Sequence, residues 1–309
     1  MSRLLIFGHT LSPLVSDSHF NERWTGPLPA RVSPATSGLQ RSGLLAMNPK
    51  THRRGERVAG QRSCVPLAPH PPLHQYYRED EARQRFLNDL FDRTASQYRN
   101  VDKATGLGSG IWYRRRALRQ AGLGPGMHVL DVACGPGLMA QCAHDVVGPF
   151  GSVIGLDPSL GMLREASKGP CGKLVMGIGE RLPFADAQFD FLSMGYALRH
   201  LSDLRLAFAE YWRVLKPGGV VLLLDICRPR SPLLLSLSRF YIKTVLGIAF
   251  SASTGNRGMK TLMDYWWDTT ESCVQPETVV DALMEAGFAE CSEHEMFSGL
   301  LHDYRAVRT

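Results

Sequence analysis

The stretch HVLDVACGPGLMAQCA, residues 128–143, constrains the fold of this chain more than any other segment. An apolar, strand-like run leads into a loop of small residues, and a helix-like segment follows it directly. Gly135 and Gly137 permit backbone angles that other residues avoid and let a ligand approach the main chain. This strand–loop–helix order predicts the first turn of an open parallel sheet, where ligands bind at the carboxyl ends of the strands.

Strand-like and helix-like segments continue to alternate along the chain. The predicted strands are 128–132, 152–156, 173–177, 188–194 and 219–226, with two more at 288–296 and 302–308. The predicted helices are 136–147, 159–167, 203–215 and 276–287. Alternation at this spacing predicts an α/β, Rossmann-like, doubly wound and mostly parallel sheet with an antiparallel strand at its C-terminal end.

The net positive charge of the chain comes entirely from its first quarter. The formal net charge is +6, and residues 1–75 contain nine Lys/Arg and three Asp/Glu, so they account for all of it. The remaining 26 basic and 26 acidic residues balance. The body therefore offers no overall electrostatic attraction for nucleic acid, and we expect no nucleic-acid partner.

Residues 1–75 are rich in Pro, Gly, Ser and Arg and show no sustained periodicity, which predicts a disordered tail. An over-extended start, with Met47 as the later initiation point, and an organelle-targeting peptide are the alternatives. Helical spacing begins near Tyr76, so the folded domain is expected over 76–309.

Cysteine usage and hydropathy favour a cytoplasmic protein. The chain has seven cysteines, an odd number, and no C-x-x-C pair, so we expect reduced thiols and neither a disulfide framework nor a zinc site. No run of about 20 uncharged apolar residues occurs, and therefore no membrane-spanning helix is expected. The N-terminus has a short apolar patch without a convincing cleavage site, which argues against a secretory signal.

A carboxylate at the expected distance accompanies the glycine loop. Asp157 ends the predicted strand SVIGLD, 20 residues beyond Gly137, which is the spacing expected for an acid that accepts hydrogen bonds from a ribose diol. The loop is short and lacks the full G-x-G-x-x-G pattern, which counts against NAD or FAD. The loop alone is also compatible with a plain βα turn, and only the combination with Asp157 indicates an adenosine ligand.

At these motifs the chain resembles the class I S-adenosylmethionine-dependent methyltransferases, and most closely the ubiquinone/menaquinone C-methyltransferases. The resemblance runs from about Phe86 to Arg308. The segments that carry it are FDRTASQY, VLDVACGPG, GLDPSLGML, ERLPFADAQFDFLSMGYALRHLSD, EYWRVLKPGGVVLLLDICRP and LMEAGF. The stretch LPFADAQFDFLSMGYALRHLSD is the most specific, because its ALRH is similar to the family's Leu-Arg-Asn signature.

The resemblance implies a cofactor site for S-adenosylmethionine and no metal. Residues Asp131, Ala133, Gly135 and Gly137 would surround the methionine moiety, and Tyr98 would contact its amino-acid end. The residues implied for the adenosine part are Asp157 at the ribose, Pro158 and Met162 near the adenine, and Glu180 and Arg181 along the adenine edge. Ile178 stands where relatives usually have Asp or Asn, so a backbone contact at Gly179 is the alternative there.

Methyl transfer to a phenol ring carbon needs a group that removes the proton of the ring hydroxyl or stabilises the negative charge left on its oxygen. The resemblance matches Arg199 to the arginine that assists deprotonation through a water; a surface pair with Asp203 is the alternative. His200 stands where relatives have Asn and is a candidate base; the alternative is a polar surface histidine. Asp225 ends the fifth strand and is expected at the cleft mouth, unless it only pairs with Arg228.

A helical insertion over about 230–270 follows the fifth strand and is expected to form a lid. Within it, residues 232–251 place Leu233, Leu237, Tyr241, Val245 and Ile248 on one helical face and Arg239 and Lys243 on another. This pattern fits either an interfacial helix on a membrane or a lid packed on the core. The aromatic residues Tyr265, Trp266 and Trp267 follow, as walls of a ring-binding site or as core.

These features together predict a methyltransferase that C-methylates a polyprenyl quinol or a related phenol. The alternatives are a methyltransferase for a small phenolic metabolite or an amine-bearing lipid, and a non-catalytic S-adenosylmethionine-binding subunit of a lipid-biosynthesis complex. The expected partner is a lipid-like aromatic acceptor, with peripheral membrane contact. The methylated atom and the oligomeric state stay open at this point.

Overall fold

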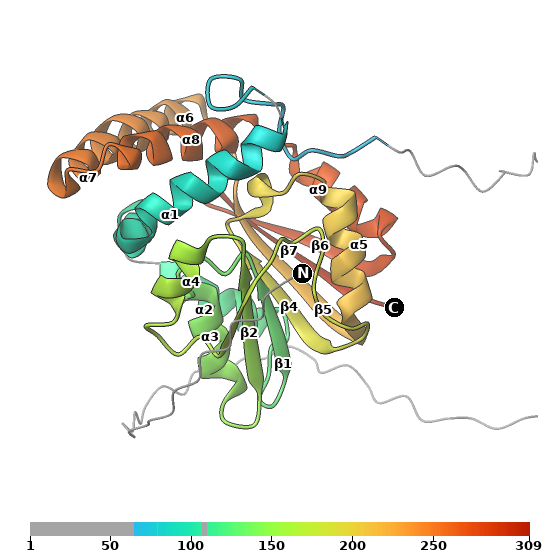
Figure 1. Ribbon diagram of the computed structural model, residues 1–309. Helices are drawn as coiled ribbons and strands as arrows, with labels where there is room; N and C mark the ends of the chain where they lie inside the picture. Colours follow the sequence, from blue (N-terminus) through green and yellow to red (C-terminus); the bar gives the residue numbers. More distant parts are fainter. Residues whose placement is uncertain (1–64, 79, 107–109) are drawn as a thin grey trace, which may run out of the picture. The chain divides into compact units, whose positions relative to one another are not determined.

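A computed structural model describes residues 65–78, 80–106 and 110–309, so the first 64 residues of the predicted tail lie outside the described part. Seven strands form one sheet in the order β3-β2-β1-β4-β5-β7-β6 (Figure 1). Every neighbouring pair up to β5 is parallel, and β7 is antiparallel to both β5 and β6. The strand bounds are β1 His128–Val132, β2 Ser152–Asp157, β3 Lys173–Met176, β4 Phe189–Gly195, β5 Leu215–Ile226, β6 Phe288–Met296 and β7 Leu301–Arg308.

This is the doubly wound, mostly parallel sheet that the alternation predicts, and the predicted strands and helices are confirmed nearly to the residue. The largest difference is in β5, which begins at Leu215 and not at residue 219. Leu215 pairs with Phe189 before a register shift in β4, and Gly218 has a φ of +79°. The segment LKPGG, which precedes the predicted strand, is therefore an irregular first part of β5.

Helices cover both faces of the sheet and also the carboxyl ends of its strands. One face is packed by α5 and α9, and the other by α2, α3 and α4. A third cluster, formed by α1 and the helices after β5, lies at the carboxyl end (Figure 1). The bounds are α1 Asp80–Thr105, α2 Gly110–Gln120, α3 Leu138–Val147, α4 Leu160–Ala166, η1 Leu198–His200, α5 Leu204–Val214, α6 Pro232–Arg239, η2 Phe240–Leu246, α7 Gly247–Thr254, α8 Gly258–Ser272 and α9 Pro276–Glu285.

The parallel register brings the ends of the strands level with one another. His128 pairs with Ser152, and Val132 pairs with Leu156, so β1 and β2 end at the same height. Side chains and loops that follow these strands therefore meet at one edge of the sheet. This edge is where a ligand site is expected in a doubly wound fold.

The insertion after β5 is a continuous helical run, α6–η2–α7, that packs along α8 and carries one π-helical segment, η2. Within the 23 residues Pro232–Thr254, the most apolar 18-residue window has a mean hydropathy of 1.5, and only 17% of that window is buried. By length and composition alone, this run is apolar enough to cross a membrane. Two ion pairs, Arg239–Glu271 and Lys243–Asp268, join it to α8.

The last part of the predicted tail is ordered structure, which corrects the boundary expected at residue 75. The amide of Leu67 donates to Asp203, and the carbonyls of Leu67 and Pro69 accept from Leu204 and Val274. His70 is buried. Backbone hydrogen bonds of this kind hold residues 65–75 against the domain, a contact that Pro-rich composition does not reveal.

Gly137 provides a test of how tightly the first βα turn is packed. Its φ is +82°, and a Cβ at this position would lie 2.1 Å from Cys171 Sγ. Gly137→Ala should therefore cost about 1–2 kcal/mol in backbone strain and a further ~1–3 kcal/mol in overpacking. Urea unfolding measures the change in the free energy of unfolding.

Gly126→Ala is the matched control. Its φ is +80°, but a Cβ there meets no described atom within 4 Å, so only the strain contribution should appear. Equal losses of stability in the two variants would contradict the tight contact with Cys171.

Candidate active site

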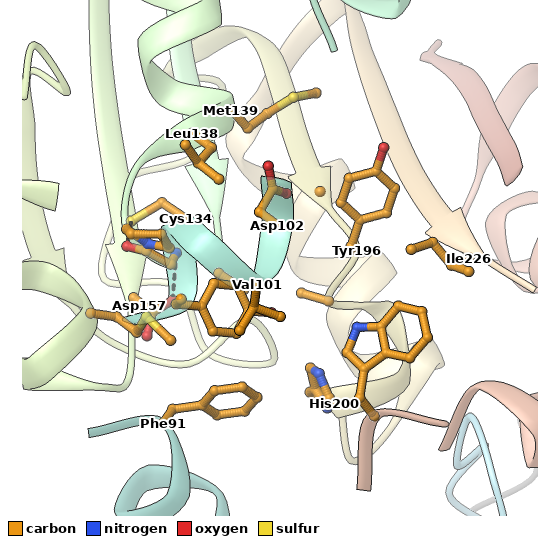
Figure 2. Close-up of a pocket in the computed structure, with 18 of the residues that line it drawn as sticks. Phe91, Val101, Asp102, Cys134, Leu138, Met139, Asp157, Tyr196, His200 and Ile226 are labelled. Atoms are coloured by element: carbon orange, nitrogen blue, oxygen red, sulfur yellow. Dashed lines mark hydrogen bonds between the residues drawn. The ribbon is translucent and has the colours of Figure 1, made fainter. Parts of the chain in front are cut away.

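A cavity of about 630 Å³ opens at the carboxyl ends of β1, β2 and β4 (Figure 2). Its walls come from the glycine loop, the ends of β2 and β4, the inner side of α1, and the helices of the insertion. This volume lies in the range of pockets that bind a small ligand. The cavity is therefore the candidate active site among the described residues.

Asp157 forms the fixed point of one side of this cavity. Its Oδ2 accepts a hydrogen bond from the Gly135 amide and its Oδ1 one from the Ser159 amide, both at 2.8 Å. A carboxylate offers about four lone-pair positions, so two remain for a diol. Burial raises the pKa of Asp157 to about 6, and the two backbone hydrogen bonds oppose that rise.

The glycine loop supplies the main chain beside Asp157. Ala133 and Gly135 both line the cavity, with φ values of +53° and +55°. A Cβ at Gly135 would meet no described atom within 4 Å, so the loop leaves open space beside the carboxylate. Left-handed backbone at a non-glycine residue is uncommon and gathers at ligand sites. Loop and acid together fit a ribose-bearing ligand.

Two residues predicted at the cofactor lie behind the loop and not on the cavity wall. Asp131 is fully buried, its Oδ1 accepts from Ser193 Oγ at 2.7 Å, and its Oδ2 has no partner in the described part of the chain. Burial raises its pKa to about 7. Gly137 begins α3 and packs against Cys171. Both residues therefore lie behind the loop in this structure, and their contact with the cofactor stays a prediction.

The side of the cavity implied for adenine is assembled as the resemblance predicts. Pro158, Met162, Gly179 and Glu180 all line it, together with Ile178. The side chain of Glu180 is already occupied, since its Oε1 accepts from the amide and the hydroxyl of Ser202. Arg181 does not line the cavity; its backbone forms an antiparallel β-bridge with Ile178.

Helix α1 closes the cavity from above and is anchored to the loops that it covers. Asp92 Oδ1 accepts from Ser159 Oγ at 2.6 Å and from the Gly161 amide at 2.7 Å, and Arg99 donates to the Pro136 carbonyl at 2.7 Å. Tyr98, predicted at the cofactor, lines the cavity from this helix. These contacts hold α1 over the glycine loop and over the start of α4.

Arg199 and Asp225, predicted as catalytic residues, form a buried ion pair behind the cavity wall. Arg199 Nη1 lies 3.2 Å from Asp225 Oδ1, and neither side chain lines the cavity. Among the described residues, Arg199 forms no ion pair with Asp203 and Asp225 forms none with Arg228. Trp266 covers the Arg199 guanidinium, with the ring centroid 5.0 Å away. The pair therefore lies behind the cavity wall in this structure, and its catalytic role stays a prediction.

His200 does line the cavity, between two aromatic rings. Its imidazole stacks on Tyr265 with centroids 5.8 Å apart and meets the edge of Phe91 at 5.2 Å. Its Nδ1 is buried and has no partner among the described residues. Burial, and then the charges of Arg199 and Arg83, lower the pKa of His200 well below its ordinary value. The imidazole is therefore neutral at physiological pH, and the histidine is not a surface residue.

Arg83 is a functional residue that sequence reasoning missed. Its guanidinium is buried beneath His200 and donates to the backbone carbonyls of Arg199 at 3.3 Å and Leu201 at 2.9 Å. Among the ion pairs of the described residues, none involves Arg83. A buried cation without a paired acid among the described residues leaves net positive charge at this end of the cavity. No motif marks it, because α1 and η1 are brought together only by folding.

Tyr196, Asp102 and Arg114 are three further lining residues outside the predicted site. Tyr196 follows β4 with a φ of +61°, and the Arg114 guanidinium lies over its ring at 4.8 Å from the centroid. Arg114 is also paired with Asp102 from α1. Sequence spacing gives no sign of this cluster, since it joins β4, α1 and α2.

A comparison with protein families decides the chain's membership. The model of the ubiE/COQ5 methyltransferase family matches residues 78–308, which is nearly the whole described domain. The chain belongs to this family. It is accordingly an S-adenosylmethionine-dependent methyltransferase, and the cavity with Asp157 is the place that fits this cofactor.

Individual relatives agree with the family. A demethylmenaquinone methyltransferase of Symbiobacterium thermophilum is 31% identical over 219 residues, 68% of this chain and 87% of that protein. A 2-phytyl-1,4-naphtoquinone methyltransferase of Synechococcus elongatus is 32% identical over 222 residues, 70% of this chain and 94% of that protein.

Solved structures show the same fold at lower identity. An S-adenosylmethionine-dependent methyltransferase of Aquifex aeolicus superposes with a TM-score of 0.50 at 18% identity, covering 70% of this chain and 98% of that one. A methyltransferase of Thermotoga maritima gives 0.51 at 19% identity, covering 72% and 100%.

The pKa of Asp157 predicts how cofactor binding depends on pH. The ionised carboxylate accepts the ribose hydroxyls, and burial raises its pKa to about 6, so affinity is present above that pH and is lost as the pH falls through it. The dissociation constant for S-adenosylhomocysteine should then rise about tenfold per pH unit well below the pKa. Calorimetry across this range measures it.

Two variants distinguish the role of Asp157 in cofactor binding from that of Asp131. Asp157→Asn should bind weakly at every pH with a flat profile, while Asp131→Asn should keep the profile because Asp131 lies behind the loop. A dissociation constant that stays unchanged in the natural protein from neutral to acidic pH would contradict the assigned role of Asp157.

Proposed function

We propose that this enzyme transfers the methyl group to a ring carbon of a quinol or naphthoquinol that carries an isoprenoid-like tail. The observation that supports this most directly is His200, a neutral imidazole that lines the cavity between two aromatic rings and near the buried Arg83 and Arg199, with a buried Nδ1 that has no partner among the described residues. The relatives named above are methyltransferases of demethylmenaquinone and phytyl-naphthoquinone.

The half of the cavity around His200 suits a flat apolar ring. Phe91, Ile226, Ile242 and Trp266 line it together with the imidazole. Aromatic rings favour edge-to-face and offset contacts with walls of this kind. Trp266 therefore serves as a wall of the acceptor site in this proposal, while Trp267, which is fully buried, belongs to the core.

The buried arginines favour the reactive form of the acceptor. A quinol carbon becomes nucleophilic when its ring hydroxyl loses a proton, and positive charge nearby lowers the cost of the phenolate. Arg83 and Arg199 supply that charge from behind the wall, with only Asp225 as a paired acid. His200 accepts the hydroxyl proton at Nδ1 or orients the hydroxyl by a hydrogen bond.

S-adenosylmethionine supplies an electrophilic methyl group on sulfur when it is bound. The ring carbon forms the new C–C bond as the methyl–sulfur bond breaks, and the ring proton then leaves to restore the aromatic ring. The protein's share is to align the two ligands, exclude water and stabilise the phenolate. The closed helix α1 and the insertion provide the exclusion of water.

An acceptor panel tests the function directly. The protein is incubated with methyl-labelled S-adenosylmethionine and matched quinols, small phenols and amine-bearing lipids. We expect label on a ring carbon of a prenylated quinol. Label only in an amine or a small phenol would overturn the quinol assignment, and cofactor binding without turnover of any acceptor would favour a non-catalytic subunit.

His200→Asn tests the role of the imidazole. Loss of a general base should lower kcat by about 100-fold or more, while the affinity for S-adenosylhomocysteine stays the same because His200 does not touch the ribose side. Tyr265→Phe, which keeps the stacked ring, is the control. A variant that keeps full activity would show that His200 is not the base.

We also propose that the enzyme works as a peripheral protein at the cytoplasmic surface of a membrane. On the insertion, Leu233, Leu237, Phe240 and Ile248 are more than half exposed, whereas Tyr241 and Ile242 line the cavity. Tyr241, expected on the same helical face as Leu233 and Leu237, lies in the π-helical segment η2 and lines the cavity instead. One helical run thus offers an apolar outer face and a wall for the acceptor.

Vesicle flotation tests this surface. Replacing Leu233, Leu237 and Phe240 by Ser removes exposed apolar area worth about 1.5 kcal/mol or more per side chain, so vesicle binding should fall at least tenfold while turnover of a short-tailed acceptor is retained. Phe150→Ser, at a residue 89% exposed beyond α3, is the control. Equal flotation of all three proteins, or none, would contradict the membrane assignment.

A further inference from the structure

The turn between β6 and β7 holds an aromatic residue in a backbone conformation that disfavours it. Met296 pairs with Leu301, so the four residues 297–300 form the turn. The φ angle is +54° at both Phe297 and Ser298. Glycine adopts this left-handed region readily, whereas a bulky side chain is strained there. A phenylalanine at this position therefore calls for an explanation.

The strain at Phe297 is not offset by burial on folding. The residue is 62% exposed, so its ring removes little apolar surface from water. Two hydrogen bonds fix the turn through its backbone: the Arg230 amide donates to the Ser298 carbonyl at 3.2 Å, and the Cys227 amide to the Leu300 carbonyl at 2.9 Å. The stability of the turn thus comes from main-chain contacts and does not need an aromatic ring.

Strained residues of this kind gather at ligand sites. The described non-glycine residues with positive φ are Ala133, Ala187, Tyr196, Glu290, Phe297 and Ser298. Three of them, Ala133, Tyr196 and Phe297, line the cavity. Ala133 is small, and the Tyr196 ring already lies under the Arg114 guanidinium, 4.8 Å from its centroid. Phe297 is the one of these three that brings a large exposed ring to the cavity.

An apolar strip joins Phe297 to the end of the cavity proposed for the acceptor ring. Ile226, a wall of that ring site, ends β5 and pairs with Leu301 of β7. Leu300 and Phe297 belong to the adjoining turn, and all four residues line the cavity. Figure 2 shows Ile226 on the side of the cavity away from Asp157. A substituent on a ring at Ile226 therefore meets apolar side chains and not the ribose site.

The same strip leads toward the exposed apolar face of the insertion. Arg230, whose amide holds the turn at Ser298, lies just before α6, and Leu233 in the first turn of α6 is 70% exposed. The Arg230 side chain pairs with Glu295 at 2.7 Å, so its charge is balanced beside the turn. An apolar chain that leaves the cavity here would emerge beside the surface proposed to meet the membrane.

We infer that Phe297 covers the isoprenoid-like tail of the acceptor where the tail leaves the cavity, and that this contact selects tailed over tailless acceptors. The inference rests on the proposed function, because it takes a quinol ring at Ile226 as its starting point. The exposed ring of Phe297 is then buried in the complex and not on folding. An acceptor that ends at its ring gains nothing from Phe297.

Two hydroquinones test the inference without turnover. Both have the same ring, but one carries a geranyl group where the other carries a methyl group. The protein is saturated with S-adenosylhomocysteine, so no methyl group can be transferred. Anaerobic calorimetry should show tighter binding of the geranyl compound by the natural protein. Phe297→Gly should weaken that binding about tenfold or more, the loss expected for uncovering one large apolar side chain, and should leave the methyl compound within about twofold.

Matched variants separate this contact from folding. Glycine adopts a φ of +54° without strain, so the thermal transition of Phe297→Gly should not lie below that of the natural protein. Ala187→Gly is the control, because Ala187 has a φ of +51° but precedes β4 at the opposite edge of the sheet and does not line the cavity. It should leave both dissociation constants unchanged. Phe297→Tyr, which keeps the ring, should retain the preference for the geranyl compound.

The outcomes distinguish the inference from the proposed function. Equal weakening of both hydroquinones by Phe297→Gly, or no weakening of either, would overturn the inference and leave the quinol ring assignment standing. Equal affinity of the natural protein for the two compounds would do the same. If the natural protein bound neither hydroquinone, the proposed function would fall and the inference with it.

Discussion

The clamp on the Asp157 carboxylate is the interaction on which the rest of the site depends. Amides of Gly135 and Ser159 hold its two oxygens, so one buried acid joins the end of β1, the end of β2 and the start of α4. This works only because the parallel register brings the two strands level. Asp92 of α1 then binds the same turn through Ser159 and Gly161, and the cavity roof is thereby tied to the cavity floor.

Charge is distributed around the cavity in a way that fits two ligands of different chemistry. At one end, Arg83 and the Arg199–Asp225 pair place positive charge behind a neutral His200. At the other, Arg114 and Asp102 present both signs within the wall itself. Burial makes each of these groups effective, since electrostatic interactions are stronger away from water.

The elements that carry a local signal were predictable. β1, the glycine loop and Asp157 lie where strand pattern and spacing place them, because each depends on neighbours in sequence. Pairings across the fold carried no such signal. Arg199 was expected to reach the acceptor, yet it pairs with Asp225. Arg83, which donates hydrogen bonds to the carbonyls on either side of His200, belongs to α1 and lies more than a hundred residues away in the sequence.

The sequence by itself determined the fold class: the alternation of strands and helices specifies a doubly wound sheet, and the short glycine loop with the spaced acid specifies a site for an adenosine ligand, because period and spacing are local properties of the chain. The methyltransferase class came from the resemblance of its motifs to a known family. Only the tertiary structure decided which side chains share the cavity. Helix α1 and the insertion come from segments on either side of the strands, and Tyr241 of the π-helical segment η2 lines the cavity. Long-range packing sets those positions, and the hydrophobic periodicity of the sequence does not predict them.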